Sequence, residues 1–287
     1  MMPALSTPVA AEALPFSLDW QSQVLSLGSC FADEMGRRLS DSGFVVEQNP
    51  FGTLYNPASG ASALRRIMDD HEVQAIDLVQ HEGLWHSWHH HGAFSHPTAD
   101  ETLAACNQRL HQAHRALREA TLLVVTFGTA YVYEYHGQVV ANCHKLPADQ
   151  FTRRRLTTDE IVSLWSPLLD ELLVRHPSLS ILFTVSPIRH LADGAHGNQL
   201  SKSILLLAVD QLVARQAQRV AYFPAYEIVL DELRDYRFFG PDMAHPTALA
   251  ADIVWHRFQQ ATMSPAVQQQ AHNNAKCTLR CKHVPIH

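Results

Sequence analysis

Short apolar runs alternate with amphipathic segments along most of the chain. The runs are rich in β-branched and aromatic residues, which is typical of buried strands, and they occupy residues 24–27, 44–46, 122–126, 181–185 and 220–223. The segments between or after them repeat apolar residues at helical spacing, at 31–40, 58–68, 103–119, 159–174, 201–216 and 248–260. Strands that alternate with helices predict a three-layer α/β/α fold with a mainly parallel five-stranded sheet.

Candidate functional residues follow the predicted strands at their carboxyl ends, where parallel sheets bind ligands. In chain order these residues are Ser29, Cys30, Gly52, Gly128, Thr129, Arg189 and His190. We expect a segment around 73–94, and a hairpin that turns near His136, to build walls on the same edge of the sheet.

The turn after the first strand places a hydroxyl, on Ser29, and a thiol, on Cys30, at the start of the first helix. The unpaired N–H groups and the positive end of the helix dipole stabilise a thiolate or an oxyanion there. Both residues are therefore candidate nucleophiles, and thiolate chemistry favours Cys30. In the structural alternative, Ser29 only caps the helix and Cys30 is a small buried residue.

Asp242 and His245 stand three residues apart on a loop that ends in proline. A carboxylate at this spacing can accept the imidazole Nδ1–H and direct Nε2 toward a nucleophile. The pair follows the last predicted strand, so it belongs to the same edge of the sheet. With Cys30 or Ser29 it predicts a catalytic triad.

These motifs resemble the GSCFA family, a bacterial group named for the pentapeptide at positions 28–32 and placed among the SGNH/GDSL-like hydrolases. The resemblance covers roughly residues 20–260 and runs through FGTLYNP at 51–57, TFGTAY at 126–131, NCHK at 142–145, SPIRH at 186–190 and the Asp242/His245 pair. It implies an SGNH-hydrolase-like, flavodoxin-like fold. An ungapped overlay on the Gly-Asp-Ser-Leu motif of many SGNH enzymes puts Cys30 in the position of the serine, and a shift by one residue restores Ser29.

The resemblance also implies an oxyanion hole made by the N–H of the nucleophile, a glycine N–H and an asparagine side chain. Gly52 and Gly128 are the candidate glycines. The Gly-x-Asn-Asp block of the superfamily reads Gly-Thr-Ala-Tyr at 128–131, and an alanine side chain cannot donate a hydrogen bond. The third donor is then Thr129, Asn142, Asn56 or none, and we prefer Asn142.

Six residues are candidates for contact with a substrate: Asn56, Trp88, His91, Lys145, Arg189 and His190. Trp88 offers a flat face for a sugar ring or an acyl chain. Lys145, like Lys202, could hold an anionic group or be an ordinary structural lysine. Arg189 and His190 could bind a substrate oxygen or, equally, organise their loop through Asp193.

The histidines at positions 86, 89, 90, 91 and 96 raise the question of a metal site. No clear helix brings them to one face and no acidic ligand is interleaved, so a loop that lines the substrate site is the favoured interpretation. We predict neither a metal nor a cofactor.

Composition limits the remaining choices. A chain of 287 residues, 46% of them hydrophobic, can bury one large core, which we place in a single domain at 20–262. Residues 1–19 are expected to form an extension, and residues 263–287 a poorly ordered tail. With 22 basic and 28 acidic residues, the chain lacks the charge pattern of a nucleic-acid or membrane-surface binder.

Five cysteines in a large domain favour reduced thiols, and no span or signal segment is evident, so we expect a cytoplasmic protein. The function that we predict is hydrolysis of a small-molecule or saccharide acyl ester, or transfer of its acyl group to another hydroxyl, through a covalent acyl-enzyme. The alternative is a binding protein that has kept the fold and lost turnover. The sequence does not predict an oligomeric state.

Overall fold

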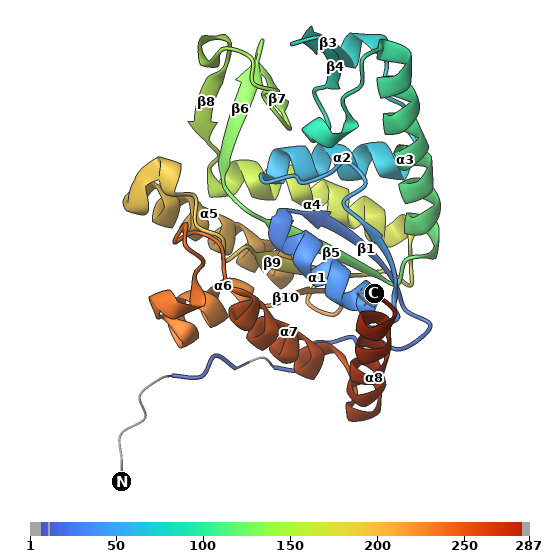
Figure 1. The fold of residues 1–287 in the computed structure, drawn as a ribbon, viewed down its shortest axis with the longest axis vertical. Coiled ribbons are helices and arrows are strands. Elements are labelled where there is room, and N and C mark those ends of the chain that lie inside the picture. Colours follow the sequence, from blue (N-terminus) through green and yellow to red (C-terminus); the bar gives the residue numbers. More distant parts are fainter. Residues whose placement is uncertain (1–6, 11, 283–287) are drawn as a thin grey trace, which may run out of the picture.

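A five-stranded parallel sheet forms the centre of the computed structural model, which describes residues 7–10 and 12–282 (Figure 1). Its strands are β1 (Gln23–Gly28), β2 (Val45–Gln48), β5 (Leu122–Phe127), β9 (Ser180–Val185) and β10 (Val220–Tyr222). They lie in the order β10-β9-β5-β1-β2, and every neighbouring pair is parallel. Counted along the chain, this is the 2-1-3-4-5 order of flavodoxin-like folds. The predicted fold class is confirmed.

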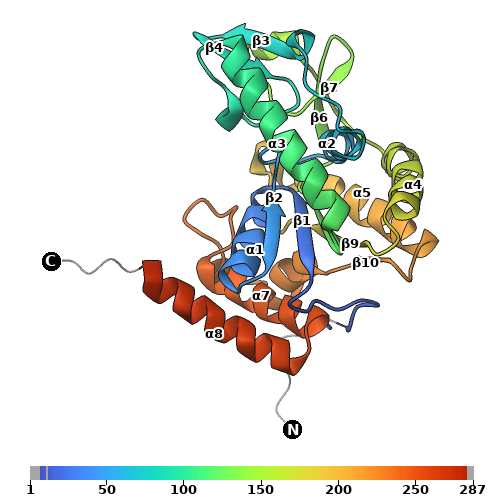
Figure 2. The same cartoon turned by 90° about the vertical axis from the view of Figure 1, so that its right-hand side faces the viewer.

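Helices cover both faces of the sheet, because the side chains of β1, β5, β9 and β10 alternate between two apolar clusters. One cluster includes residues of α2 (Pro57–Asp69), α3 (Ala99–Glu119), α4 (Thr158–Arg175) and α5 (Gly194–Arg215). The other includes residues of α1 (Cys30–Asp41), α6 (Ala225–Glu227), α7 (Ala248–Thr262) and α8 (Pro265–Lys282). Figure 2 shows α1, α7 and α8 on the opposite side of the sheet from α2, α4 and α5.

Two small antiparallel sheets stand above the carboxyl edge of the main sheet (Figure 1). One is the hairpin of β3 (Leu78–His81) and β4 (Leu84–Ser87), and the other joins β6 (Tyr131–Tyr135), β7 (Gln138–Val140) and β8 (Thr152–Arg155). The predicted hairpin is confirmed, since β6 and β7 pair around the turn at His136 and Gly137.

The C-terminal tail is a helix where the sequence predicted poor order. Over Pro265–Lys282 the chain instead forms α8, a helix that packs on the domain through the fully buried Ala271. Asn274 Nδ2 and Thr278 Oγ1 donate to Ser42 O (3.0 Å) and Asp41 O (3.1 Å), main-chain carbonyls at the end of α1. Residues 283–287 lie outside the described residues.

The core extends past both predicted bounds of the domain, residues 20 and 262. Leu18, in the predicted extension, is buried, and its N–H donates to Thr262 O (2.7 Å). Met263 is buried as well. Within the described part of the chain, no helix combines the length and the apolar character that crossing a membrane requires.

Candidate active site

The first strand ends in a turn that only glycine fits. Gly28 has φ +146°, and a Cβ there would lie 2.3 Å from Thr126 O on the neighbouring strand. Ser29 follows with its N–H on the same carbonyl (3.3 Å), and its Oγ accepts from Phe31 N (3.3 Å) as the N-cap of α1. The side chain of Ser29 is thus the buried cap of the structural alternative.

Cys30, His245 and Asp242 form a chain of side-chain contacts at this turn. Cys30 Sγ is 3.9 Å from His245 Nε2, and His245 Nδ1–H donates to Asp242 Oδ2 at 2.5 Å. The other carboxylate oxygen accepts the N–H groups of Ala244 and His245, both at 3.0 Å. These hydrogen bonds hold the pKa of the Asp242 carboxyl well below its usual range. The structure therefore brings together the predicted nucleophile, base and orienting carboxylate, with Cys30 rather than Ser29 beside the imidazole.

Arg189 holds the loop that carries Asp242 and His245. Its main-chain N–H donates to Ala244 O (3.1 Å), and its Nη1 donates to Met243 O (3.0 Å). Met243 has φ +55°, an unusual conformation for a residue with a side chain, so the loop needs such outside support. Of the two roles considered for Arg189, the hydrogen bonds support loop organisation, although the loop is that of His245 rather than that of Asp193.

The thiol of Cys30 has a pKa above its ordinary value. Burial is the main cause, and the charge of Asp33 adds to it. The N–H groups of Cys30 and Phe31 and the charge of Lys202 act in the opposite direction. The sequence argument, that the helix N-terminus and a charged histidine lower the thiol pKa, is therefore wrong in sign, because burial has the larger effect. A base such as His245 is needed to form the thiolate.

A cavity of about 550 Å³ opens beside Cys30 and His245. Five more predicted site residues line it: Asn56, Thr129, Asn142, Arg189 and His190. Burial lowers the pKa of His190 to about 4, so its imidazole is neutral at pH 7.

Sequence reasoning missed several cavity residues that the small antiparallel sheet contributes. Tyr131 and Tyr133 of β6 and Arg153 of β8 line the cavity, and Arg153 lies 4.1 Å from the centre of the Tyr131 ring and pairs with Asp193. The signal was the period-two spacing of tyrosines at 131, 133 and 135, which on a strand places 131 and 133 on one face.

Trp88, His91 and Lys145 are not among the residues that line this cavity. Trp88 stacks on Tyr135 (4.6 Å between ring centres), and His91 packs against Gly52. The predicted substrate-lining loop instead uses its aromatic rings for internal packing.

The histidine-rich segment is likewise occupied by internal contacts. His86 Nδ1 bonds Ser95 Oγ (2.6 Å), and His90, which is fully buried, stacks on Phe51 at 4.3 Å. Among residues 7–10 and 12–282, no group of three or more His, Cys, Asp or Glu side chains is arranged to hold a metal.

The glycines predicted to form the oxyanion hole use their N–H groups elsewhere. Gly52 N–H donates to Asn49 O (2.7 Å), and the N–H groups of Gly128 and Thr129 both donate to Tyr55 O (2.8 and 2.9 Å). These donors form hydrogen bonds within the turns that follow the strands, because buried N–H groups are almost always paired. In this structure the N–H groups of Gly52 and Gly128 therefore already have main-chain partners, whereas the sequence predicted them as oxyanion donors.

Two of the predicted oxyanion donors remain at the cavity. Cys30 is the first residue of α1, where a helix supplies no partner for the N–H. Asn142 lines the cavity and is oriented through its Oδ1, which accepts from His144 N (2.8 Å). Thr129 and Asn56 are tied into other contacts, through Ser201 Oγ (3.0 Å) and through Ser59 N (2.8 Å) and Ser59 Oγ (3.0 Å) respectively.

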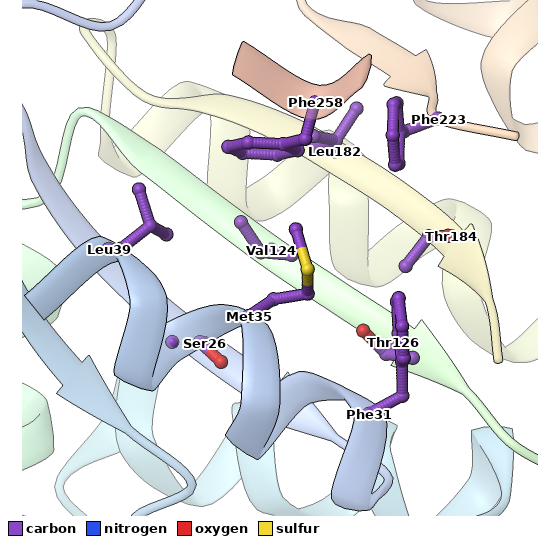
Figure 3. A pocket seen from close by; sticks show the side chains of 11 residues that line it. Ser26, Phe31, Met35, Leu39, Val124, Thr126, Leu182, Thr184, Phe223 and Phe258 are labelled. Carbon is purple, nitrogen blue, oxygen red and sulfur yellow. The ribbon is translucent and has the colours of Figure 1, made fainter. Parts of the chain in front are cut away.

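A second, apolar space lies between α1 and the sheet (Figure 3). Phe31, Met35, Val124 and Leu182 are among its lining residues, and its volume of about 10 Å³ is near that of one water-sized probe. It is too small for a substrate, and its packing supports the helix that starts at Cys30.

The family model described as the GSCFA family matches residues 23–258. A comparison of the sequence with curated proteins finds no match.

Solved structures with a similar chain path include a carbohydrate esterase family 3 protein from Talaromyces cellulolyticus, at 8% identity and a TM-score of 0.42 over 88% of this chain and 99% of that one. A putative acylhydrolase from Bacteroides fragilis matches at 10% identity and a TM-score of 0.43, over 90% of this chain and 92% of that one. An acetyl xylan esterase from the rumen bacterium Butyrivibrio proteoclasticus matches at 10% identity and a TM-score of 0.43, over 85% of this chain and 64% of that one. Because these identities and TM-scores are low, the reaction must be argued from the residues of the site itself.

Proposed function

The chain belongs to the GSCFA family, and from this premise and the geometry of the site we propose that it is an acyl ester hydrolase of SGNH type that works through an acyl-enzyme on Cys30. The observation that carries the proposal is the contact of Cys30 with His245, and of His245 with Asp242, beside a cavity of about 550 Å³ that Cys30 and His245 help to line. A nucleophile, a base within reach of it and a group that orients the base are the parts that covalent acyl transfer requires.

In the first half-reaction, His245 Nε2 takes the proton of the Cys30 thiol as Sγ attacks the ester carbonyl. The carbonyl π electrons move onto oxygen, and the tetrahedral intermediate collapses with loss of the alkoxide, which takes the proton from Nε2. The product is an acyl thioester on Cys30. Asp242 keeps the proton of His245 on Nδ1, which leaves Nε2 free to act as base.

In the second half-reaction, a water or another hydroxyl attacks the thioester, and His245 takes its proton. Collapse of the intermediate expels the thiolate, which recovers the proton from His245. Hydrolysis and transfer differ only in the attacking hydroxyl. During both steps, the N–H of Cys30 and the amide of Asn142 are our candidates for hydrogen bonds to the oxyanion.

A saccharide acyl ester is the substrate class that we favour. The cavity combines the tyrosine side chains of 55, 131 and 133 with hydrogen-bonding groups of Asn142 and Arg153, a mixture that suits a ring with many hydroxyls. Transfer of the acyl group to a sugar hydroxyl is the finer form of this proposal.

The test is the identity of the acylated residue. A short-chain p-nitrophenyl ester is mixed with the wild-type protein, Cys30→Ala and Ser29→Ala, and the acyl group is located by peptide mass mapping. We expect a burst and a thioester on Cys30, loss of both in Cys30→Ala, and a retained adduct with weaker turnover in Ser29→Ala, because Ser29 only caps the turn. An acyl group on Ser29 with an active Cys30→Ala protein would reverse the assignment.

The second candidate is a binding protein that has kept the fold. The observation in its favour is that three N–H groups near the predicted oxyanion hole, those of Gly52, Gly128 and Thr129, are already paired. Loss of one oxyanion donor typically costs about 10²–10³ in rate. Stoichiometric ligand binding without acylation of any residue would select this candidate.

A further inference from the structure

Lys202 of α5 is a lysine with no exposed surface beneath the proposed active site. Its ammonium donates to Gly128 O (2.6 Å) and Ser186 O (2.7 Å), carbonyls that follow β5 and β9. No carboxylate among the described residues lies within ion-pair distance of it. A fully buried lysine is rare, and one without an anionic partner is costly unless the site itself supplies negative charge.

The place of Lys202 links it to the nucleophile turn. Gly128, whose carbonyl it binds, lies against Ser29 and His190: a Cβ on Gly128 would be 3.3 Å from Ser29 Cβ and 3.5 Å from His190 Nε2. Ser29 immediately precedes Cys30. The carbonyl that accepts from the ammonium thus belongs to a residue that lies against Ser29, the neighbour of Cys30.

We propose that Lys202 is the buried cation of this site and that its charge stabilises the negative charge that forms at Cys30. The inference rests on the proposed role of Cys30 as nucleophile. Lys202 does not line the cavity, so it is a positioning residue that acts through the thiolate and the oxyanion rather than a catalytic one. It supplies electrostatic stabilisation where the glycine N–H groups do not.

The other charged and titratable groups around the pair do not fill this role. Asp33 and Tyr55 face Cys30, and the charge of Asp33 raises the pKa of the thiol. His190 is neutral at pH 7, and the ring of Tyr226 lies 5.9 Å from the Lys202 ammonium. His245, the base, must itself be neutral to accept the proton of the thiol.

Electrostatic coupling between Lys202 and Cys30 should make the reactivity of the thiol depend on pH in a characteristic way. Burial lowers the pKa of Lys202 to about 7, whereas the charge of Cys30 raises it. Below about pH 7 the ammonium is charged and favours the thiolate, and above that pH the effect fades as the proton leaves.

The first experiment measures the rate of Cys30 alkylation by iodoacetamide across pH, with mass mapping to separate Cys30 from the other four cysteines. In Lys202→Met we expect a rate constant about tenfold lower near pH 6, the effect of one pKa unit, and convergence with the wild type in alkaline solution. Ser201→Ala is the matched control. It removes the hydroxyl that accepts from Ala130 N (2.7 Å) at the same helix–strand junction but keeps the charge, so any change should be independent of pH. Equal rates near pH 6, or a constant factor at every pH, would overturn the proposal.

The second experiment needs no substitution, so it stands if Lys202→Met fails to fold. The chain contains four lysines, and ¹³C labelling at lysine Cε makes a group that titrates near 7 easy to follow by NMR. Cys30 is alkylated with iodoacetate, which leaves a carboxylate, or with iodoacetamide, which leaves a neutral amide. Because coupling is reciprocal, the carboxylate adduct should raise the Lys202 titration midpoint above that of the amide adduct.

Neither readout requires turnover, so the two proposals fail separately. Identical Lys202 midpoints in the two adducts, with acylation of Cys30 intact, overturn the role of Lys202 alone. A shifted midpoint without acylation by any ester supports the cation and overturns the hydrolase.

Discussion

Neighbouring residues at the start of α1 have different environments. Ser29 is buried and caps the helix, whereas Cys30 lines the cavity and meets His245. One peptide unit thus separates a structural hydroxyl from a candidate nucleophile. The thiol is not activated by its own surroundings, since burial and Asp33 raise its pKa, so the proposed activity depends on the imidazole.

Asp242→Asn tests this dependence at the scale of one residue. The amide keeps the size of the carboxylate but favours the wrong imidazole tautomer, so we expect kcat to fall by up to about 10⁴, with the fold unchanged by circular dichroism. Asp235→Asn, an exposed carboxylate that pairs with Arg237, is the matched control and should stay near wild type. Normal turnover in Asp242→Asn would mean that another group orients His245.

At the scale of elements, helix α8 supplies hydrogen-bond donors to the C-terminal end of α1. The last carbonyls of a helix have no partner within it, and α8 donates side-chain hydrogen bonds to two carbonyls where α1 ends. The small sheet of β6, β7 and β8 adds to the main sheet in another way, because it builds part of the cavity wall. It follows β5 directly and supplies Tyr131, Tyr133 and Arg153 to the cavity.

Asn274→Ala tests the contact of α8 with α1. Loss of the hydrogen bond to Ser42 O leaves that carbonyl unpaired, and we expect the free energy of unfolding to fall by about 1 kcal/mol in urea titrations. Asn273→Ala, the exposed neighbour on the same helix, should change it far less. Equal effects of the two substitutions would show that helix propensity, not the contact, sets the stability.

At the scale of the whole molecule, buried imidazoles make stability depend on pH. Burial lowers the pKa of His144 to about 4, and that of His90 well below its ordinary value. The unfolded chain binds protons at these groups near pH 6.5, but the folded chain does not until about pH 4 at His144. Acid within this window therefore favours unfolding.

We expect the free energy of unfolding to fall between pH 7 and pH 5, and His144→Gln to reduce this fall by about 2 kcal/mol. Glutamine can keep a donor toward Ser87 O, the present partner of His144 Nε2 (2.8 Å), without a group that titrates. Urea unfolding at both pH values measures the difference, and His256→Gln on the exposed side of α7 is the control. An unchanged pH dependence in His144→Gln would contradict the assignment.

The sequence by itself determined the elements and their class. Short apolar runs located each strand of the main sheet, and the chemistry of the 28–32 turn and the Asp242/His245 spacing identified three groups that meet in space. These features were readable because each depends on a local pattern: a short apolar run for a buried strand, a repeat of 3.6 residues for a helix, and a spacing of three residues from Asp to His.

The tertiary structure decided which of these groups are available for chemistry. Competition for hydrogen bonds assigned the N–H groups of Gly52 and Gly128 to carbonyls at Asn49 and Tyr55, and burial set the sign of the Cys30 pKa shift. The same packing turned the residues at 265–282 into a helix and enclosed Lys202 with main-chain carbonyls as its partners. None of this is encoded in local spacing, because burial and pairing depend on partners far away in the sequence.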